Sequence, residues 1–441
     1  MREYRWFQAL WAICVLAAVV PIQAQESLQL NLEKGVALAL ERNEEVLQAG
    51  REREKAEEGR RVVKSELLPH VEASFNYDRN WLLPSFVFDS TKVKIGTDNN
   101  MVGRIGLRQA LYGGGKIGAG LGYARLNLER TQQAERQIHQ AVRAAVEAQF
   151  YELLLARELV EAGELALERA RANLSQVEAL KRAGRASEYD ILRAQVQVSQ
   201  LATDSLQAQN RRRLALMTLL DVVGLDLDQK VAVAGDFRLE SGVEEQGLEV
   251  LLDMARQRRP ELLQAQYRAD MQQRLVTVEK AEGRPSLDLV ANGQMQLQSD
   301  SFDLGSDDWQ RSWNTGLQLT VPLFDGRETG ALVAQARIEV EQAQLQLQRL
   351  HRQVSLEIRQ AWLNLAETGQ RVQNQAATVT QAERGLAIAE ARYRAGQGTQ
   401  LETLDAQLVL LQARTAYAQA RLDRSLAVVA LERAVGVLGE G

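Results

Sequence analysis

Two short segments of the chain place glycine, hydroxyl and acidic side chains at the same spacing, and these are its best candidates for ion-binding chemistry. The segments are residues 181–191 and 393–406. In each, Ala-Gly precedes Ser187 or Thr399, and an acid follows three residues later at Asp190 or Glu402. Glycine suits a left-handed helix C-cap, and the hydroxyl-acid spacing suits a capping box on the next helix. Capping accounts for Asp190 and Glu402 as structural residues, but it does not account for Asp405.

A glycine-rich segment at 113–118 matches the spacing of a nucleotide-binding loop, reading Gly-Gly-Gly-Lys-Ile-Gly. No parallel strand-helix-strand pattern surrounds it, and the equivalent segment 325–330 loses the spacing. Ile117 also stands where a P-loop needs Ser or Thr to bind magnesium. The sequence therefore predicts a strand-to-helix turn here and no cofactor site.

Metal-binding and nucleophilic side chains are scarce. His139 and His351 each lack a second histidine or a carboxylate pair at metal spacing. The single cysteine, Cys14, lies in an apolar N-terminal run, so the chain after that run has no thiol. No Ser-His-Asp arrangement stands at readable spacing. We expect no enzyme activity, no metal and no cofactor.

The second half of the chain repeats the first. Residues 41–69 align with 257–285 at a shift of 216, and from there to the end the shift is 212. At that second shift, Val223-Gly224 falls on Val435-Gly436. The copies are expected at 25–237 and 238–441. Such a duplication favours internal pseudo-symmetry over one asymmetric active site.

Each copy has the same order of predicted elements: a first helix, two strands, a long helix and a return helix. In copy one these are 31–67, about 70–82, about 101–111, 116–183 and 190–222. In copy two they are 247–283, about 286–298, about 312–323, 328–395 and 402–435. Pro69 and Pro285 end the first helices. The tracts 85–259 and 323–441 contain no proline, and they are expected to carry the long helices.

The predicted strands alternate apolar and polar residues, as in Val71, Phe75 and Tyr77 against Glu72 and Asn76. This period gives each strand one apolar face, and a lipid-facing barrel strand needs about 9–11 such residues. A soluble sheet is the alternative. Four strands cannot close a membrane barrel, so several chains would have to share one, and three chains would supply twelve strands.

The N-terminus has the pattern of a secretory signal peptide at residues 1–24. Arg2 and Arg5 precede an apolar run at 9–20, which is too short to span a bilayer comfortably. The formal net charge is −5, with no basic patch, so we expect no nucleic-acid partner. No later stretch approaches 18 apolar residues, which leaves a soluble exported protein or a membrane β-barrel.

The order of these motifs resembles the TolC-like outer-membrane efflux channels over nearly the whole chain after the signal. The resemblance rests on the duplication, on 111–114 (Leu-Tyr-Gly-Gly), on 321–326 (Val-Pro-Leu-Phe-Asp-Gly) and on the Ala-Gly turns. It implies a mainly α fold with membrane β: a homotrimer with a shared 12-stranded β-barrel in outer-membrane lipid and a 12-helix periplasmic α-barrel.

The resemblance also implies roles for the two helix-turn-helix tips. Glu402 and Asp405 match an acidic pore constriction, while Asp190 and Tyr393 match positions that hold the closed state. The chain departs at Gly398, where the family pattern has an arginine that links to the Asp190 position. Three arginines are candidates to replace that link: Arg182, Arg185 and Arg394.

The tips further resemble the surface that meets a periplasmic adaptor protein, at Gly184, Arg185, Gly396 and Gln397. The expected function is a passive exit duct of a tripartite efflux or type I secretion system, with an inner-membrane pump as energy source. Two rivals are a soluble periplasmic coiled-coil adaptor or scaffold, and an envelope enzyme built on a helical bundle. The transported substrate does not follow from the sequence.

Overall fold

The computed structural model describes residues 28–89, 91–240, 242–302 and 308–439, and the signal-peptide prediction at 1–24 lies outside them. The helices are α2 (Leu32–Arg42), α3 (Glu44–Ser65), α4 (Lys116–Arg182), α5 (Glu188–Val223), α6 (Leu248–Arg258), α7 (Pro260–Glu282), α8 (Glu328–Arg394) and α9 (Gln400–Val435). The strands are β1 (Leu28–Leu30), β2 (His70–Arg79), β3 (Ser85–Phe88), β4 (Thr91–Lys94), β5 (Asn99–Gly113), β6 (Val231–Val233), β7 (Ser286–Ser299) and β8 (Gln310–Thr320). None of the described helices combines the length and hydropathy needed to cross a membrane.

The four main strands and the four long and return helices start and end within three residues of the predicted bounds. The largest difference is at strand ends, as in β8, which stops at Thr320 where 323 was expected. Pro322 explains this end because proline has no N–H to donate to a strand ladder. Within the segment 113–118, Gly114 and Gly115 form the turn between β5 and α4.

The prediction of one first helix per copy was wrong, because each copy has two. The expected helix 31–67 is broken at Asn43 into α2 and α3, and the expected helix 247–283 is broken at Arg259 into α6 and α7. Both break residues are extended, with ψ of 131° and 120°. Pro260 favours the second break because the residue before a proline is disfavoured in the helical region.

The same packing contact occupies both breaks. Gly224 and Gly436 each end a return helix in the left-handed conformation (φ of 77° and 84°), and each packs on the backbone of a break. Asn43 donates from its amide to the Val222 carbonyl at 3.1 Å. Arg259 donates to the equivalent Ala434 carbonyl at 3.2 Å. The break therefore receives the end of the return helix, which a continuous helix would not allow.

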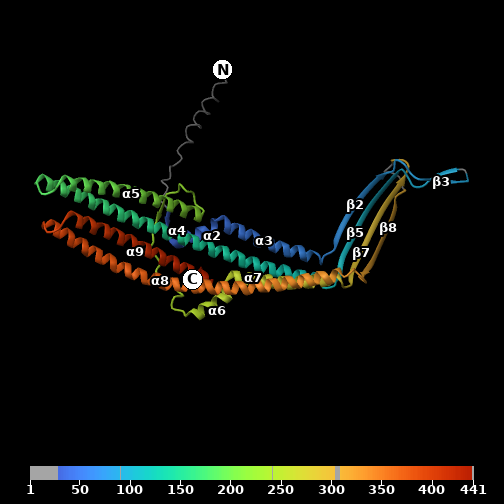
Figure 1. Ribbon diagram of the computed structural model, residues 1–441. Coiled ribbons are helices and arrows are strands. Elements are labelled where there is room, and N and C mark those ends of the chain that lie inside the picture. Colours follow the sequence, from blue (N-terminus) through green and yellow to red (C-terminus); the bar gives the residue numbers. More distant parts are fainter. Residues whose placement is uncertain (1–27, 90, 241, 303–307, 440–441) are drawn as a thin grey trace, which may run out of the picture. The chain divides into compact units, whose positions relative to one another are not determined.

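The four main strands form one antiparallel sheet in the order β2-β5-β7-β8, so strands of both copies join in it (Figure 1). The register aligns odd-numbered residues across all four strands, as in Ala73 opposite Ile105 and Gly293 opposite Trp313. This face is apolar and largely exposed: Phe75 is 63% exposed and Trp313 82%. The even-numbered face is polar.

That polar face is cross-linked between strands. Arg104 donates to Gln294 at 3.2 Å, and Arg108 pairs with Asp288 at 3.0 Å. Within the described residues, β2 pairs only with β5 and β8 only with β7. The sheet therefore has two open edges in this chain.

Two small strand pairs were not predicted. β1 and β6 pair in parallel, and β3 and β4 form a hairpin between β2 and β5. Each of these strands has only three or four residues, so no alternating pattern is long enough to reveal them.

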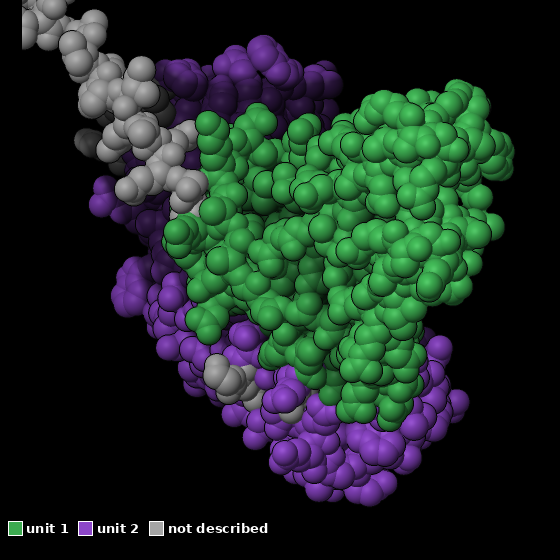
Figure 2. Space-filling view, turned by 90° about the vertical axis from the view of Figure 1, so that its left-hand side faces the viewer, with its two compact units in different colours: residues 1–43, 145–239, 369–426 green, residues 44–144, 240–368, 427–441 purple. Residues whose placement is uncertain are grey.

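The compact units of the structure do not coincide with the sequence copies. One unit comprises 1–43, 145–239 and 369–426, and the other comprises 44–144, 240–368 and 427–441 (Figure 2). Each long helix contributes one half to each unit, so both units contain parts of both copies. The second unit has an apolar core in which Leu251, Ile358 and Leu431 are fully buried. In the first unit, Phe150 and Tyr151 are buried and Tyr151 stacks on Phe237.

Candidate functional site: the helix tips and the sheet face

The first tip joins α4 to α5, and its acid is held by the helix cap. Gly184 is left-handed (φ of 72°), and the backbone N–H of Arg185 donates to the Leu180 carbonyl at 2.8 Å, which closes a Schellman motif. Ser187 caps α5, and Asp190 accepts from the Ser187 N–H at 2.8 Å and hydroxyl at 2.7 Å. These hydrogen bonds from Ser187 lower the pKa of Asp190. The predicted capping box is present.

The second tip joins α8 to α9 and closes differently. Gly396 is left-handed (φ of 73°), and the Thr399 hydroxyl accepts from the Glu402 N–H at 3.3 Å. The Glu402 carboxylate does not complete a capping box. It lies 3.4 Å from the Arg392 guanidinium, which also donates to the Gln397 carbonyl at 3.1 Å.

Gly398 leaves room for this arrangement. A Cβ there would lie 3.2 Å from the Arg392 Cβ, from the Tyr393 nitrogen and from the Glu402 carboxylate. A larger side chain at Gly398 would therefore displace one of these groups. Glycine at position 398 therefore lets Arg392 reach Glu402.

Polar contacts tie the two tips together. Gln400 donates to the Asp190 carbonyl at 3.3 Å, and Arg185 lies beside Gly396. Tyr393 is partly buried, and its burial together with the negative charge of Asp190 raises its pKa. Sequence reasoning identified Asp190 and Tyr393 but missed Gln400, which is 7% exposed.

Of the arginines predicted to replace the link at Gly398, Arg394 pairs with Glu390 at 3.8 Å on its own helix, and Arg185 lies beside Gly396 of the other tip. That Arg182, Arg185 or Arg394 replaces the link stays a prediction. The contact to the acidic tip comes from Arg392, directly before Tyr393. The sequence signal for this contact is that Arg392 stands ten residues before Glu402, across a turn with two glycines.

Asp405 is exposed on α9, one turn beyond Glu402, and has no hydrogen bond or ion pair to any residue that the structure describes. The neighbouring side chains Leu401 and Leu408 are 44% and 47% exposed. Asp405 is thus the one acid of the predicted constriction whose charge no described side chain compensates. No group of three His, Cys, Asp or Glu side chains in the described ranges is arranged to hold a metal ion.

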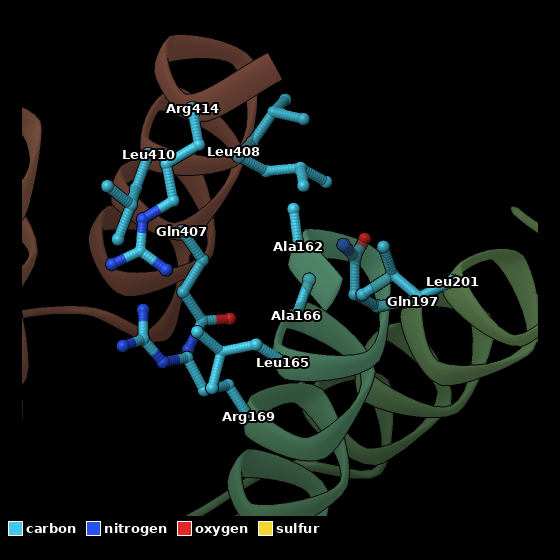
Figure 3. Close-up of a pocket in the computed structure, with 11 residues that line it drawn as sticks. Ala162, Leu165, Ala166, Arg169, Gln197, Leu201, Gln407, Leu408, Leu410 and Arg414 are labelled. Carbon is cyan, nitrogen blue, oxygen red and sulfur yellow. The ribbon is translucent and has the colours of Figure 1, made fainter. Parts of the chain in front are cut away.

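A groove lies between the α4–α5 pair and α9, further along the helices from the tips (Figure 3). Leucine and alanine side chains such as Leu165, Leu201 and Leu410 line most of it. Arg169 extends across it from α4 toward α9, beside Gln407 (Figure 3). The groove is formed by helices of both copies and is apolar with cationic side chains at its margin.

The fold of duplicated helix pairs with one four-stranded sheet is shared with solved outer-membrane channels. The solved Campylobacter jejuni CmeC outer membrane channel has this fold, with a TM-score of 0.79 and 21% identity over 92% of this chain and 85% of that one. The chain matches the model of the outer membrane efflux protein family over residues 35–225 and 251–437, and it belongs to that family. It is an outer-membrane protein.

Two curated relatives span most of the chain. Protein CyaE of Bordetella pertussis is 28% identical over 348 residues, which cover 78% of this chain and 72% of the relative. The alkaline protease secretion protein AprF of Pseudomonas aeruginosa is 24% identical and covers 97% and 88%. The expected resemblance to TolC-like channels is confirmed.

Proposed function

We propose that this protein is a passive, trimeric exit duct through the outer membrane for a tripartite efflux or type I secretion system. The observation that carries the proposal is the four-stranded sheet, with one exposed apolar face and two open edges. An apolar face of this size is stable only against lipid or protein. Unpaired strand edges cannot face lipid, because their backbone groups would have no hydrogen-bond partners.

Sharing the sheet among three chains answers both requirements. β8 of one chain would pair with β2 of the next, which closes a barrel of twelve strands. The odd-numbered side chains, such as Phe75 and Leu317, would then face lipid. The helices would continue into the periplasm as a tunnel that needs no nucleotide or catalytic site of its own.

The helix tips form the gate in this proposal. Asp405 and Glu402 from three chains would surround the axis at the periplasmic end, where grouped carboxylates favour cations. The contacts of Asp190, Tyr393 and Gln400 hold the two tips of each chain together in the narrow state. Opening would be selected by a partner that binds the separated tips better.

A periplasmic adaptor is the proposed partner, and its inner-membrane pump supplies the energy. Its docking surface would include Gly184, Arg185, Gly396 and Gln397 at the tips and the leucine-lined groove above them (Figure 3). An amphipathic helical hairpin fits such a groove because apolar anchors on one helix face fill it. Acidic residues beside those anchors would meet the arginines at its margin.

The decisive experiment measures native mass and single-channel conductance on one detergent-extracted sample. We expect a trimer that requires detergent and conducts weakly with a preference for cations. A water-soluble monomer or dimer without conductance would contradict the shared barrel and with it the proposed function.

A further inference from the structure

A second cavity near the tips is lined by both polar and apolar atoms and lies between the two copies. It is open to solvent on one side, has a volume of about 200 Å³ and is lined by α4 of copy one and by α8 and α9 of copy two. The side chains that bear on its chemistry are Arg169, Asn173, Gln176, Tyr393, Thr403 and Gln407. The cavity is smaller than the pockets of about 300–1,000 Å³ that hold drug-sized ligands, which favours a small occupant.

Two deeply buried side chains in this cavity have unpartnered polar atoms. Asn173 is 7% exposed and Thr403 is 3% exposed. The Asn173 amide nitrogen and the Thr403 hydroxyl have no hydrogen-bond partner within the described residues. Other helical threonines differ: the hydroxyls of Thr368 and Thr415 donate to the carbonyl four residues earlier. Buried polar groups without partners are destabilising, so two of them in one cavity indicate a ligand.

The charge of the lining favours an anion. Arg169 has no acid three or four residues away on α4 and no ion pair within the described part of the chain. Glu390 and Arg394 also line the cavity, and they pair with each other at 3.8 Å. The lining therefore carries one uncompensated positive charge together with an amide and a hydroxyl donor.

We propose that this cavity binds a small oxyanion, with phosphate or carboxylate oxygens accepting from Arg169, Asn173 and Thr403. Such an anion would bridge the first copy and the second copy a few turns behind the tips. On the proposed function as a gated duct, it would favour the state in which the tips are together. Binding itself does not depend on that function.

Equilibrium dialysis of the full-length, detergent-purified protein with labelled inorganic phosphate tests the site, with succinate as competitor at constant ionic strength. We expect saturable binding of one anion per chain, and about tenfold weaker binding by Arg169→Gln. Arg171→Gln is the matched control, because Arg171 is exposed on the same helix, does not line the cavity and carries the same charge. Displacement by succinate at equal concentration would identify a carboxylate ligand, and failure to displace would identify phosphate.

Thr403→Val provides a second test that a folding defect would not imitate. It keeps the side-chain shape and removes the unpartnered hydroxyl, so it should raise the melting temperature without anion and remove the increase that phosphate gives. Absence of saturable binding up to millimolar phosphate and succinate, or equal weakening by Arg169→Gln and Arg171→Gln, would mean that the cavity holds water only. Anion binding without any channel conductance would contradict the proposed function as a duct but would still support the anion site.

Discussion

In the proposed constriction, Asp405 should contribute more to ion selectivity than the Glu402–Arg392 pair as a whole. Asp405 has no partner among the described residues, whereas the Glu402 carboxylate lies 3.4 Å from the Arg392 guanidinium. An isolated charge acts on an ion through its full Coulomb potential. A pair of opposite charges acts as a dipole, and at about 10 Å its effect is smaller by roughly the ratio of separation to distance, about one third.

The magnitude follows from three chains. Three Asp405 carboxylates about 10 Å from an ion on the axis change its energy by about 1.2 kcal/mol in water. Screening at 0.1 M salt leaves about 0.45 kcal/mol. Cations and anions shift in opposite directions, so Asp405→Asn should lower the cation-to-anion permeability ratio roughly fourfold to fivefold. Neutralising the pair by the double variant Glu402→Gln, Arg392→Gln should lower it only about 1.6-fold. Glu402→Gln alone removes a full charge and should act about as strongly as Asp405→Asn, and Arg392→Gln alone should raise the ratio.

Reversal potentials in planar bilayers under a salt gradient measure these ratios directly. The three substitutions are close to isosteric or conserve polarity, so each mainly changes charge. The expected rank order does not depend on the assumed distance: Asp405→Asn has a larger effect than the double variant Glu402→Gln, Arg392→Gln, and Arg392→Gln alone has the opposite sign. An equal or larger effect of the double variant would refute the pairing of Glu402 with Arg392, and no effect of Asp405→Asn or of Glu402→Gln would remove both acids from the pore.

Three further predictions concern stability and insertion. Gly436→Ala should destabilise the protein by about 1–2 kcal/mol in thermal unfolding, because its φ of 84° is left-handed and its Cβ would lie 3.0 Å from backbone. Ser187→Ala should speed amide exchange in the first turn of α5 by about fivefold, since a lost N-cap costs about 1 kcal/mol. The pKa of Asp190 is lowered in the folded state. The hydrogen bonds to the Asp190 carboxylate should therefore stabilise the protein fully above its unfolded pKa of about 3.9, and this stabilisation should be lost as the pH falls through the lower folded pKa. Amide exchange measured against pH should show a smaller loss in Ser187→Ala. Leu317→Arg should reduce heat-stable assembly in membranes, at a cost of about 2–4 kcal/mol per chain near the bilayer centre, while Gln318→Arg on the opposite face should not.

The long elements were predictable because their signals are local. The expected helix 116–183 is observed as Lys116–Arg182, since a tract without proline and with apolar residues at helical spacing has few alternatives. The four main strands were equally local, because each alternates over ten or more residues. The order of these strands in one sheet follows from pairing between copies, which no local pattern encodes.

The helix breaks were missed because they depend on distant residues. Asn43 is an ordinary helix-boundary residue, and its amide bonds a carbonyl 179 residues away. Pro260 is a local signal for the second break. At the repeat shift of 216 it aligns with Glu44, so the duplication also indicates the first break. The contact of Arg392 with Glu402 was missed for a related reason: it depends on the tight turn that Gly398 permits.

The duplication has produced two tips that share a fold and differ in what holds them. Both reverse at a left-handed glycine with a Schellman bond, so the backbone route is the same. In copy one the Asp190 carboxylate accepts hydrogen bonds within its own N-cap, and such a cap contributes about 1 kcal/mol. In copy two the Glu402 carboxylate lies outside the cap and pairs with the exposed Arg392, and exposed ion pairs contribute between about 0 and 1 kcal/mol. The contact of the Glu402 side chain is thus weaker than that of the Asp190 side chain, while Thr399 still accepts from the Glu402 N–H in copy two. On the proposed function, the acids of the gate would lie on the tip whose acidic side chain is held less strongly.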